Sequence, residues 1–335
     1  MIGPAPKGRR FERRPFGAGR LFVGRVRPRA AALGYFRPPL RGENKTRWAN
    51  RTPMRVAGLI PLATEAFGRL YRNRALTLAL AKREVTDKYT RQVLGSVWAV
   101  GHPLILVCVY IFLFRMVLGV RLGGTAGLPE FDYIVYLLSG LIPWLAVQES
   151  LNKGTTVVTS SANLVKQVVF PVEVLPVKSV LACFVTQAVG TVCLAAYVLF
   201  KHPELPVNYT GLPQTFALLP VWWVFQALGM AGIVFAISAL GVYVRDIKEL
   251  VQVFSVVGMY LVPIVYQPHM VPPSIEPLLF LNPFSHMVWC YQDACYFGYP
   301  EHWYAWIVFP VGSVLTFLVG YSLFRKLQAH FGSVL

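Results

Sequence analysis

Of the 335 residues, 55% are hydrophobic and only 14% are charged, whereas about a quarter of the residues in a soluble protein carry charge. Several windows are apolar for about 20 residues, enough to cross roughly 30 Å of hydrocarbon, so an ordinary soluble protein is excluded and an all-α polytopic membrane protein is indicated. The net charge of +17 does not indicate a nucleic-acid partner, because residues 1–53 hold twelve Arg and two Lys against two Glu.

Residues 1–53 form a basic arm without the continuous apolar core of a secretory signal peptide. An Arg-rich, acid-poor composition is typical of an organellar transit peptide, or of an arm that binds anionic lipid. We favour a third interpretation, in which the arm is disordered and is not translated. Met54 would then be the start, since it stands just ahead of the first helical periodicity.

An amphipathic helix is predicted over residues 65–93, ahead of the first apolar span. Apolar residues in 76–97 recur mostly every four positions, which places them on one helical stripe. Two acid–base pairs at i,i+4 spacing add about 0.2–0.5 kcal/mol each on an exposed face: Glu84–Lys88 and Asp87–Arg91. We expect the helix to lie flat on the cytoplasmic membrane surface. A simple membrane anchor is the alternative role.

Six membrane spans are predicted, and Gly95 provides an elbow before the first. The spans are 95–119, 133–152, 176–200, 214–243, 250–266 and 304–324. The segments that are basic are 54–94, 153–178, 245–250 and the end from residue 325, while the other connections carry little positive charge. Basic loops remain on the cytoplasmic side. Both termini are therefore expected in the cytoplasm, in agreement with an even number of spans.

The segment 267–303 contains no Lys or Arg and is too apolar and aromatic for a solvated loop. Five prolines prevent one continuous helix: Pro268, Pro272, Pro273, Pro277 and Pro283. Two short apolar pieces, near 275–281 and 284–297, are expected to form a re-entrant helical hairpin in the outer leaflet. Such backbone needs protein or a water-filled cavity to cover it. A hydrophobic loop on the membrane surface is the alternative.

Five stretches carry a further signal in chain order. The first is "REVTDKYTRQVLGSVWAVGHPL" (Arg83–Leu104), with Lys-Tyr, Leu-Gly, Trp and Pro-Leu at fixed spacing. The others are "LLSGLIPWLAVQESL" (137–151), "NLVKQVVFPVEVLPV" (163–177), "VYVRDIKELV" (242–251) and "LNPFSHMV" (281–288). Together they resemble the permease subunits of ABC transporters that export polysaccharides, over about residues 65–335. His102 departs from the pattern, in which Gln is commoner.

The resemblance implies two copies of this chain assembled with two copies of a nucleotide-binding subunit. Its cargo would be a lipid-linked polysaccharide, and its location the cytoplasmic (inner) membrane of a bacterium. This chain has no G-x-x-x-x-G-K-[ST] phosphate loop. ATP and Mg²⁺ are therefore expected on the partner subunit, and no catalytic, cofactor or metal site is expected in this chain.

Residues 161–171 are implied to form the coupling helix that contacts the nucleotide-binding subunit, and Pro171 prevents its continuation. The 65–93 helix would form a second contact with its charged face. The turn at Arg245 and Asp246 would form a third, or simply a local ion pair. The expected coupling residues are Asn163, Leu164, Lys166, Phe170, Arg83, Asp87, Lys88, Arg245 and Asp246.

Aromatic residues are the candidates for the substrate pathway, because their faces stack on sugar rings while Tyr hydroxyls exchange hydrogen bonds. The residues expected there are Tyr133, Tyr136, Trp144, Tyr260, Tyr266 and Trp289. Belts of Trp and Tyr at the membrane interfaces explain many of these rings equally well. The spans contain no relay of buried acids and histidines, which argues against proton- or sodium-coupled transport.

Two other functions are alternatives. The first is a permease of the related drug- or lipid-exporting branch, which the stretches 83–104 and 163–177 disfavour. The second is a membrane glycosyltransferase, which would need patterned acidic or metal-binding loops. The acids of the outer segment lack such spacing, and its histidines do not make a ligand set: Glu276, Asp293 and Glu301, and His269, His286 and His302.

Overall fold

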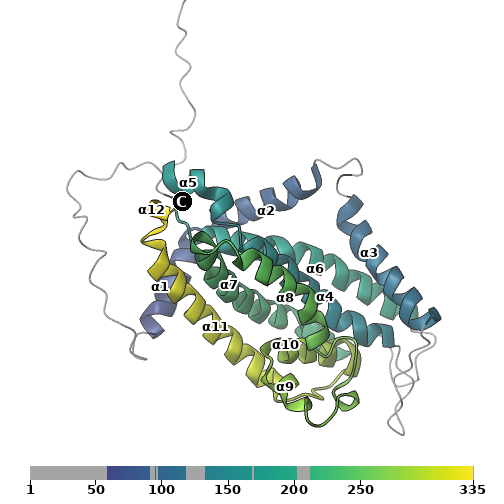
Figure 1. Cartoon of the computed structure of the whole chain (residues 1–335). Coiled ribbons are helices and arrows are strands. Elements are labelled where there is room, and N and C mark those ends of the chain that lie inside the picture. Colours follow the sequence, from purple (N-terminus) through teal and green to yellow (C-terminus); the bar gives the residue numbers. More distant parts are fainter. Residues whose placement is uncertain are drawn as a thin grey trace, which may run out of the picture. The chain divides into compact units, whose positions relative to one another are not determined.

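The computed structural model describes residues 59–90, 95, 97–117, 133–167, 170–201 and 212–334 (Figure 1). In these ranges the chain forms helices and turns, without β-strands. The basic arm 1–53 lies outside the described residues, so the predictions made for it stay predictions. Residues from Met54 onward form one unit.

The surface helix predicted over 65–93 is two helices, α1 (Leu59–Arg72) and α2 (Arg74–Thr90). Asn73 separates them: its Nδ2 donates to the Arg69 carbonyl at 3.0 Å, and its own carbonyl accepts from Thr77 Oγ1 at 3.0 Å. The backbone bonds from Asn73 N to the Arg69 carbonyl and from Thr77 N to the Asn73 carbonyl are also made, so the side-chain bonds add to the helical ones at this boundary. Apolar and polar side chains separate clearly around α1 but hardly around α2. The amphipathic helix is therefore α1, whereas the apolar stripe read from the sequence lay over 76–97, mostly in α2.

The chain turns at Gly95 before α3 (Val97–Ile111), which continues as the π-helical η4 (Phe112–Val117). Gly95 has a φ of +51°, a left-handed conformation that glycine adopts without a Cβ clash. The elbow expected at this residue is thus a glycine-dependent turn.

Four helices are long and apolar enough to cross a membrane in the part of the chain that the structure describes. They are α4 (Tyr133–Gly154), α6 (Val174–Lys201), α7 (Leu219–Tyr243) with the preceding η7 (Gln214–Leu218), and α11 (Ala305–Gln328). They coincide with four of the six predicted spans. By helix length, the described residues thus contain four candidate spans, compared with the six that were predicted.

The other two predicted spans correspond to shorter helices. The first coincides with α3 and η4, and the fifth with α8 (Ile247–Leu261), which has 15 residues. Pro263 disfavours helical backbone at the residue before it, and Val262 is extended with φ −114° and ψ 142°. The α-helix therefore stops before the predicted end at 266.

Helices α7 and α11 pack backbone to backbone. An ideal Cβ on Gly320 would lie 1.9 Å from the carbonyl oxygen of Gly232, and one on Gly232 would lie 2.4 Å from that of Thr316. Small residues permit such close approach in membrane helices. The pairing of these two helices thus depends on two glycines far apart in the sequence.

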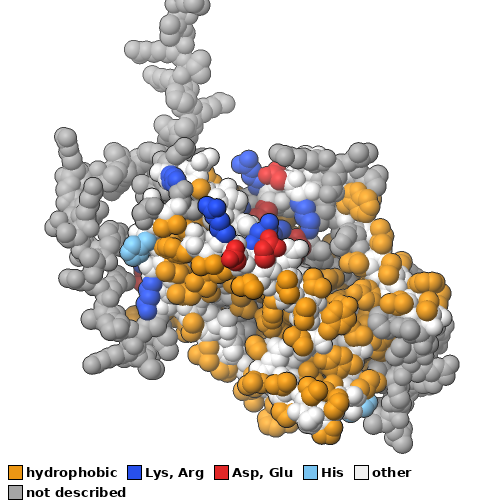
Figure 2. All heavy atoms as spheres, in the orientation of Figure 1, with side chains coloured by type: hydrophobic (Ala, Val, Ile, Leu, Met, Phe, Trp, Pro, Cys, Tyr) orange, Lys and Arg blue, Asp and Glu red, His pale blue; other side chains and the backbone are white. Residues whose placement is uncertain are grey.

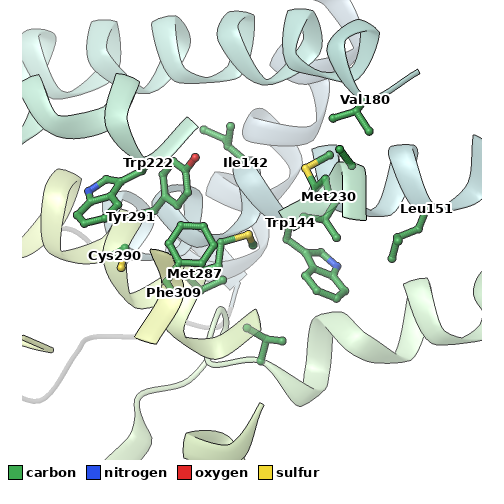
Figure 3. Close-up of a cluster of buried hydrophobic side chains, with 14 of the residues drawn as sticks. Ile142, Trp144, Leu151, Val180, Trp222, Met230, Met287, Cys290, Tyr291 and Phe309 are labelled. Carbon is green, nitrogen blue, oxygen red and sulfur yellow. The ribbon is translucent and has the colours of Figure 1, made fainter. Parts of the chain in front are cut away.

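Helix α4 lies at the centre of the bundle, in contact with α6, α7, α8 and α10 (Pro283–Gln292). Its Trp144 is fully buried and packs edge-on against Phe284 of α10, with ring centroids 5.5 Å apart. A Cβ on Gly258 of α8 would lie 2.7 Å from the Trp144 ring, so glycine makes room for the indole. Figure 3 shows Trp144, Met287 and Tyr291 within this buried cluster.

The segment 267–303 folds into η8 (Pro268–Met270), α9 (Glu276–Leu281), α10 and the π-helical η9 (Asp293–Phe297). The boundary between α9 and α10 follows from local chemistry. Asn282 Oδ1 accepts from the Phe284 backbone N at 3.0 Å, and Pro283 occupies the first helical position. Helix α10 is buried against α4, α7 and α11. That this segment enters the outer leaflet of a bilayer stays a prediction.

Candidate functional site

Charged side chains gather at one end of the molecule, and the face below them is largely hydrophobic (Figure 2). Figure 1 places α2, α5 (Ala162–Gln167) and α12 (Phe331–Val334) at this end, with α9 and α10 at the opposite one. A membrane protein that separates polar from apolar surface in this way exposes the charged end to water. We refer to it as the charged end.

Glu84 and Lys88 of α2 belong to an ion-pair network with α4 and α6. Glu84 Oε1 lies 3.3 Å from Lys153 Nζ, and its Oε2 lies 3.0 Å from Lys178 Nζ. Glu149 Oε1 lies 2.7 Å from Lys88 Nζ and 3.0 Å from Lys153 Nζ. We call these five residues the α2 network. It fastens α2 to the ends of α4 and α6. The spacing of charges along α2 alone does not predict these pairs, because the partners lie on other helices.

Glu65 and Arg69 of α1 form a second network with Glu173 and Arg325. The two carboxylates accept from both guanidinium groups at 2.9–3.1 Å, in a closed ring of alternating charge. Glu173 is buried just ahead of α6, and Arg325 lies in the last turns of α11. The ring therefore joins α1 to α11 and to the start of α6. None of these four residues was singled out from the sequence.

The three α2 residues expected to face a partner differ in placement. Arg83 and Asp87 are exposed and pair with each other, with Arg83 Nε 3.4 Å from Asp87 Oδ2. Lys88 instead reaches Glu149 of α4. Arg83 and Asp87 are thus accessible to a partner, whereas the Lys88 ammonium is bound to α4 of the same chain.

The predicted coupling segment 161–171 begins at the last residue of η5 (Thr159–Ser161) and continues as α5. Phe170 and Pro171 are not helical. Asn163, Leu164 and Lys166 are exposed, with Leu164 at 45%. Phe170 is half-buried and packs against the core. An exposed leucine on a short surface helix at the charged end is a candidate protein contact.

The turn between α7 and α8 exposes Arg245 and Asp246. The described residues show no ion pair between these two side chains, so the structure does not support the simple local-pair interpretation. Lys248 and Glu249 are exposed beside them. This turn presents charges of both signs to solvent.

Tyr133 and Tyr136, two of the predicted pathway residues, support irregular backbone after α8. The Tyr133 hydroxyl donates to the Val265 carbonyl at 2.5 Å. The Tyr136 hydroxyl lies 3.0 Å from the Tyr266 carbonyl oxygen, and Gln292 Nε2 donates to the Pro263 carbonyl at 2.9 Å. Non-helical backbone at membrane depth needs such partners. In this conformation both tyrosines act as structural supports.

The other predicted pathway residues fall into two groups. Trp144 and Trp289 are fully buried, and their indole Nε1 atoms have no hydrogen-bond partner among the described residues. Tyr260 is 61% exposed, and Tyr266 is half-buried. Tyr260 on α8 is thus the most accessible of the six aromatic residues.

Four helices share a buried polar cluster that the sequence did not indicate. Gln187 Nε2 of α6 donates to Gln226 Oε1 of α7 at 2.8 Å, and the Tyr291 hydroxyl of α10 donates to the same oxygen. Gln226 Nε2 donates to the Pro143 carbonyl of α4 at 3.1 Å. Buried polar groups need such pairing, and here it fixes the register of four helices.

Asp293 is a fully buried carboxylate at the start of η9. Its Oδ2 accepts from the His302 backbone N and from Trp306 Nε1, both at 2.9 Å, and its Oδ1 lies 2.8 Å from His302 Nδ1. The His302 ring stacks on Trp289, with centroids 5.1 Å apart. Sequence spacing showed no pattern for these residues, because the loop and α11 bring them together only in the folded chain.

Replacement of Asp293 by alanine is expected to destabilise the chain by about 3 kcal/mol or more, since each buried group left without a partner costs about 1–3 kcal/mol. Asp293→Asn retains one acceptor oxygen and should lose less. Thermal unfolding of the purified chain measures both. The exposed Glu301→Ala is the matched control and should leave the midpoint unchanged; an equal loss in Glu301→Ala would contradict the role of Asp293.

Residues 75–296 match the ABC-2 type transporter family. The O-antigen export system permease protein RfbA of Klebsiella pneumoniae is 26% identical over 262 residues, which are 78% of this chain and 95% of that protein. RfbA of Myxococcus xanthus is 25% identical over 230 residues, 68% of this chain and 82% of its own. The polysialic acid transport protein KpsM of Escherichia coli is 20% identical over 249 residues, 74% of this chain and 91% of its own.

The family match runs from the start of α2 to η9 and so contains the α2 network, α5, the α7–α8 turn and the buried polar cluster. It covers more than half of the chain. Together with four apolar helices long enough to cross a membrane, this match shows that the chain belongs to the ABC-2 type transporter family.

Proposed function

We propose that this chain is the transmembrane subunit of an ATP-driven exporter that moves a lipid-linked polysaccharide across the cytoplasmic membrane of a bacterium. The observation that carries the proposal is similarity over most of the chain to proteins named for O-antigen export and polysialic acid transport. Five sequence stretches resemble the same class of permease. The alternative of a drug- or lipid-exporting permease has no support among these relatives.

ATP hydrolysis belongs to a separate nucleotide-binding subunit in this proposal, because the chain has no phosphate-binding loop of the usual kind. Three exposed elements at the charged end are the proposed contacts. They are Asn163, Leu164 and Lys166 on α5, Arg83 and Asp87 on α2, and Arg245 and Asp246 in the α7–α8 turn. Their exposure and mixed charge suit a polar protein interface around one apolar anchor, Leu164.

The two ion-pair networks would transmit movement of the partner subunit to the membrane helices. A partner that pushes α2 also moves α4 and α6, because Glu84, Lys88 and Glu149 belong to the network that fastens these helices together. The ring around Glu173 does the same for α1, α6 and α11. Movement at the charged end can therefore reach the membrane helices without passing through a flexible linker.

In the proposed topology, α3 with η4 and α8 complete six spans, and both termini lie in the cytoplasm. The exposed apolar face of α3 would meet lipid or a second copy of the chain, while the exposed face of α8, which carries Tyr260, would border the substrate pathway. Tyr260 would touch the polymer directly. Trp144 and Trp289 would become indole donors for sugar hydroxyls only after the surrounding helices separate, since both are buried here.

Deletion of the gene is expected to leave lipid-linked polymer inside the cell and to remove it from the surface. The measurement is extraction of the polymer from the two fractions, with complementation by the wild-type chain. Normal surface polymer in the deletion strain, with a change in drug resistance instead, would refute polysaccharide export.

Leu164→Asp is expected to reduce export at least about tenfold, because a carboxylate placed in an apolar contact of the partner costs more than the 1.4 kcal/mol that a factor of ten represents. Leu164 is exposed, so the chain itself should fold normally. Surface polymer and permease-dependent ATPase activity are measured side by side. Ala329→Asp adds the same charge at an exposed position at the end of α11 and should export normally. Normal export by Leu164→Asp would remove α5 from the contact.

A further inference from the structure

A groove of about 390 Å³ lies between α3, α4 and α6, within a single chain. Pockets for small ligands typically measure about 300–1,000 Å³. The walls are mostly aliphatic and come from α3 and α4: Leu106, Val107, Leu138, Leu141, Ile142 and Leu145. Only Gly190, Thr186 and Gln187 come from α6. These walls favour a hydrocarbon chain over water or a sugar.

One end of the groove reaches the charged end of the molecule. Lys88, Glu149 and Asn152 line it there, and the first two belong to the α2 network. That network contains three lysines and two glutamates, so it carries an excess of one positive charge. A ligand with a hydrocarbon chain and an anionic headgroup complements both ends.

The length of the groove indicates which lipid fits. Its α4 residues run from Leu138 to Asn152, a distance of about 21 Å at about 1.5 Å per residue. One leaflet with its headgroups has nearly this depth, since a whole bilayer measures about 40–45 Å. An acyl chain of a phospholipid in the same leaflet therefore matches the groove, whereas a long isoprenoid chain exceeds it.

We propose that an anionic phospholipid of the leaflet at the charged end binds in this groove, with one acyl chain between α3, α4 and α6 and its phosphate beside Lys88. The lipid would fill the space between the first membrane helix and the rest of the bundle. The inference concerns a site inside one chain, so it does not depend on which polymer is exported.

The test is native mass spectrometry of the full-length chain in mild detergent, equilibrated with equal amounts of phosphatidylglycerol and phosphatidylcholine. Wild type is expected to retain phosphatidylglycerol about fivefold over phosphatidylcholine, the preference that about one excess positive charge near an anionic lipid gives. Lys88→Gln should reduce this preference while acyl-chain binding persists, and Lys88→Arg should restore it.

Leu145→Trp and Leu106→Trp place a large ring in the groove from two different helices, and both residues are half-buried. Each should retain much less lipid than wild type. Ile105→Trp is the matched control, since Ile105 is 52% exposed on α3 and does not line the groove. Monodisperse elution verifies folding, and either groove variant suffices if the other aggregates.

Three results would overturn the proposal: wild type without bound phospholipid, a folded groove variant that retains lipid like Ile105→Trp, or an isoprenoid lipid in place of the phospholipid. Retention without headgroup preference would also overturn it, because the charge at Lys88 would then have no role. Loss of polysaccharide export is no part of this test, so its outcome is separate from that of the proposed function.

Discussion

Gly320→Leu is expected to prevent stable assembly of the membrane helices. A Cβ at this position would lie 1.9 Å from the Gly232 carbonyl oxygen and 2.6 Å from its carbon, both backbone atoms of α7. No side chain can rotate away to make room, so α7 and α11 must separate. Overpacking costs about 1–3 kcal/mol when side chains absorb it, and a backbone clash should exceed this range. The measurement is the monodisperse fraction and thermal midpoint after detergent extraction.

Gly312→Leu provides the matched control on the same helix. A Cβ on Gly312 meets no atom within 4 Å, so the substitution changes helix propensity and surface without a clash. We expect it to behave like wild type. If Gly320→Leu extracts and unfolds like Gly312→Leu, the close crossing of α7 and α11 does not exist in the protein.

Glu84→Gln is expected to loosen α2 from the membrane helices and to uncouple ATP hydrolysis from export. The change removes the carboxylate that lies 3.3 Å from Lys153 and 3.0 Å from Lys178. Breaking a fully buried pair costs about 3–5 kcal/mol, and these side chains keep partial contact with water, so about 1–3 kcal/mol is expected here. Thermal unfolding reports the stability change, while export per ATP hydrolysed reports the coupling.

Asp87→Asn is the comparison for an exposed pair on the same helix. The Arg83 and Asp87 side chains are 77% and 64% exposed, and such pairs contribute less than about 1 kcal/mol. The double variant Glu84→Gln/Lys178→Met should recover part of the lost stability, because it removes the uncompensated ammonium. Equal effects of Glu84→Gln and Asp87→Asn, with no recovery in the double variant, would show that the α2 network does not fasten α2.

Hydropathy alone placed four long helices within a few residues of their observed bounds, because a run of about 20 apolar residues has one favourable arrangement in a bilayer. Residue type likewise predicted the turn at Gly95 and the division of 267–303 into short helices at its prolines. The single helix predicted over 65–93 is instead divided at Asn73, where side-chain hydrogen bonds to the Arg69 and Asn73 carbonyls add to the backbone ones.

The sequence by itself therefore determined the class of protein, the positions of the long apolar helices and, through motif order, the family. Only the tertiary structure decided the partners of the charges and rings. Lys88 pairs with Glu149 across 61 positions of chain, and Tyr136 supports backbone 130 positions away. Spacing along one helix cannot encode such contacts, because they depend on how separate helices approach. For the same reason, the sequence did not show that Tyr133 and Tyr136, whose place in the pathway stays a prediction, hydrogen-bond to the backbone after α8.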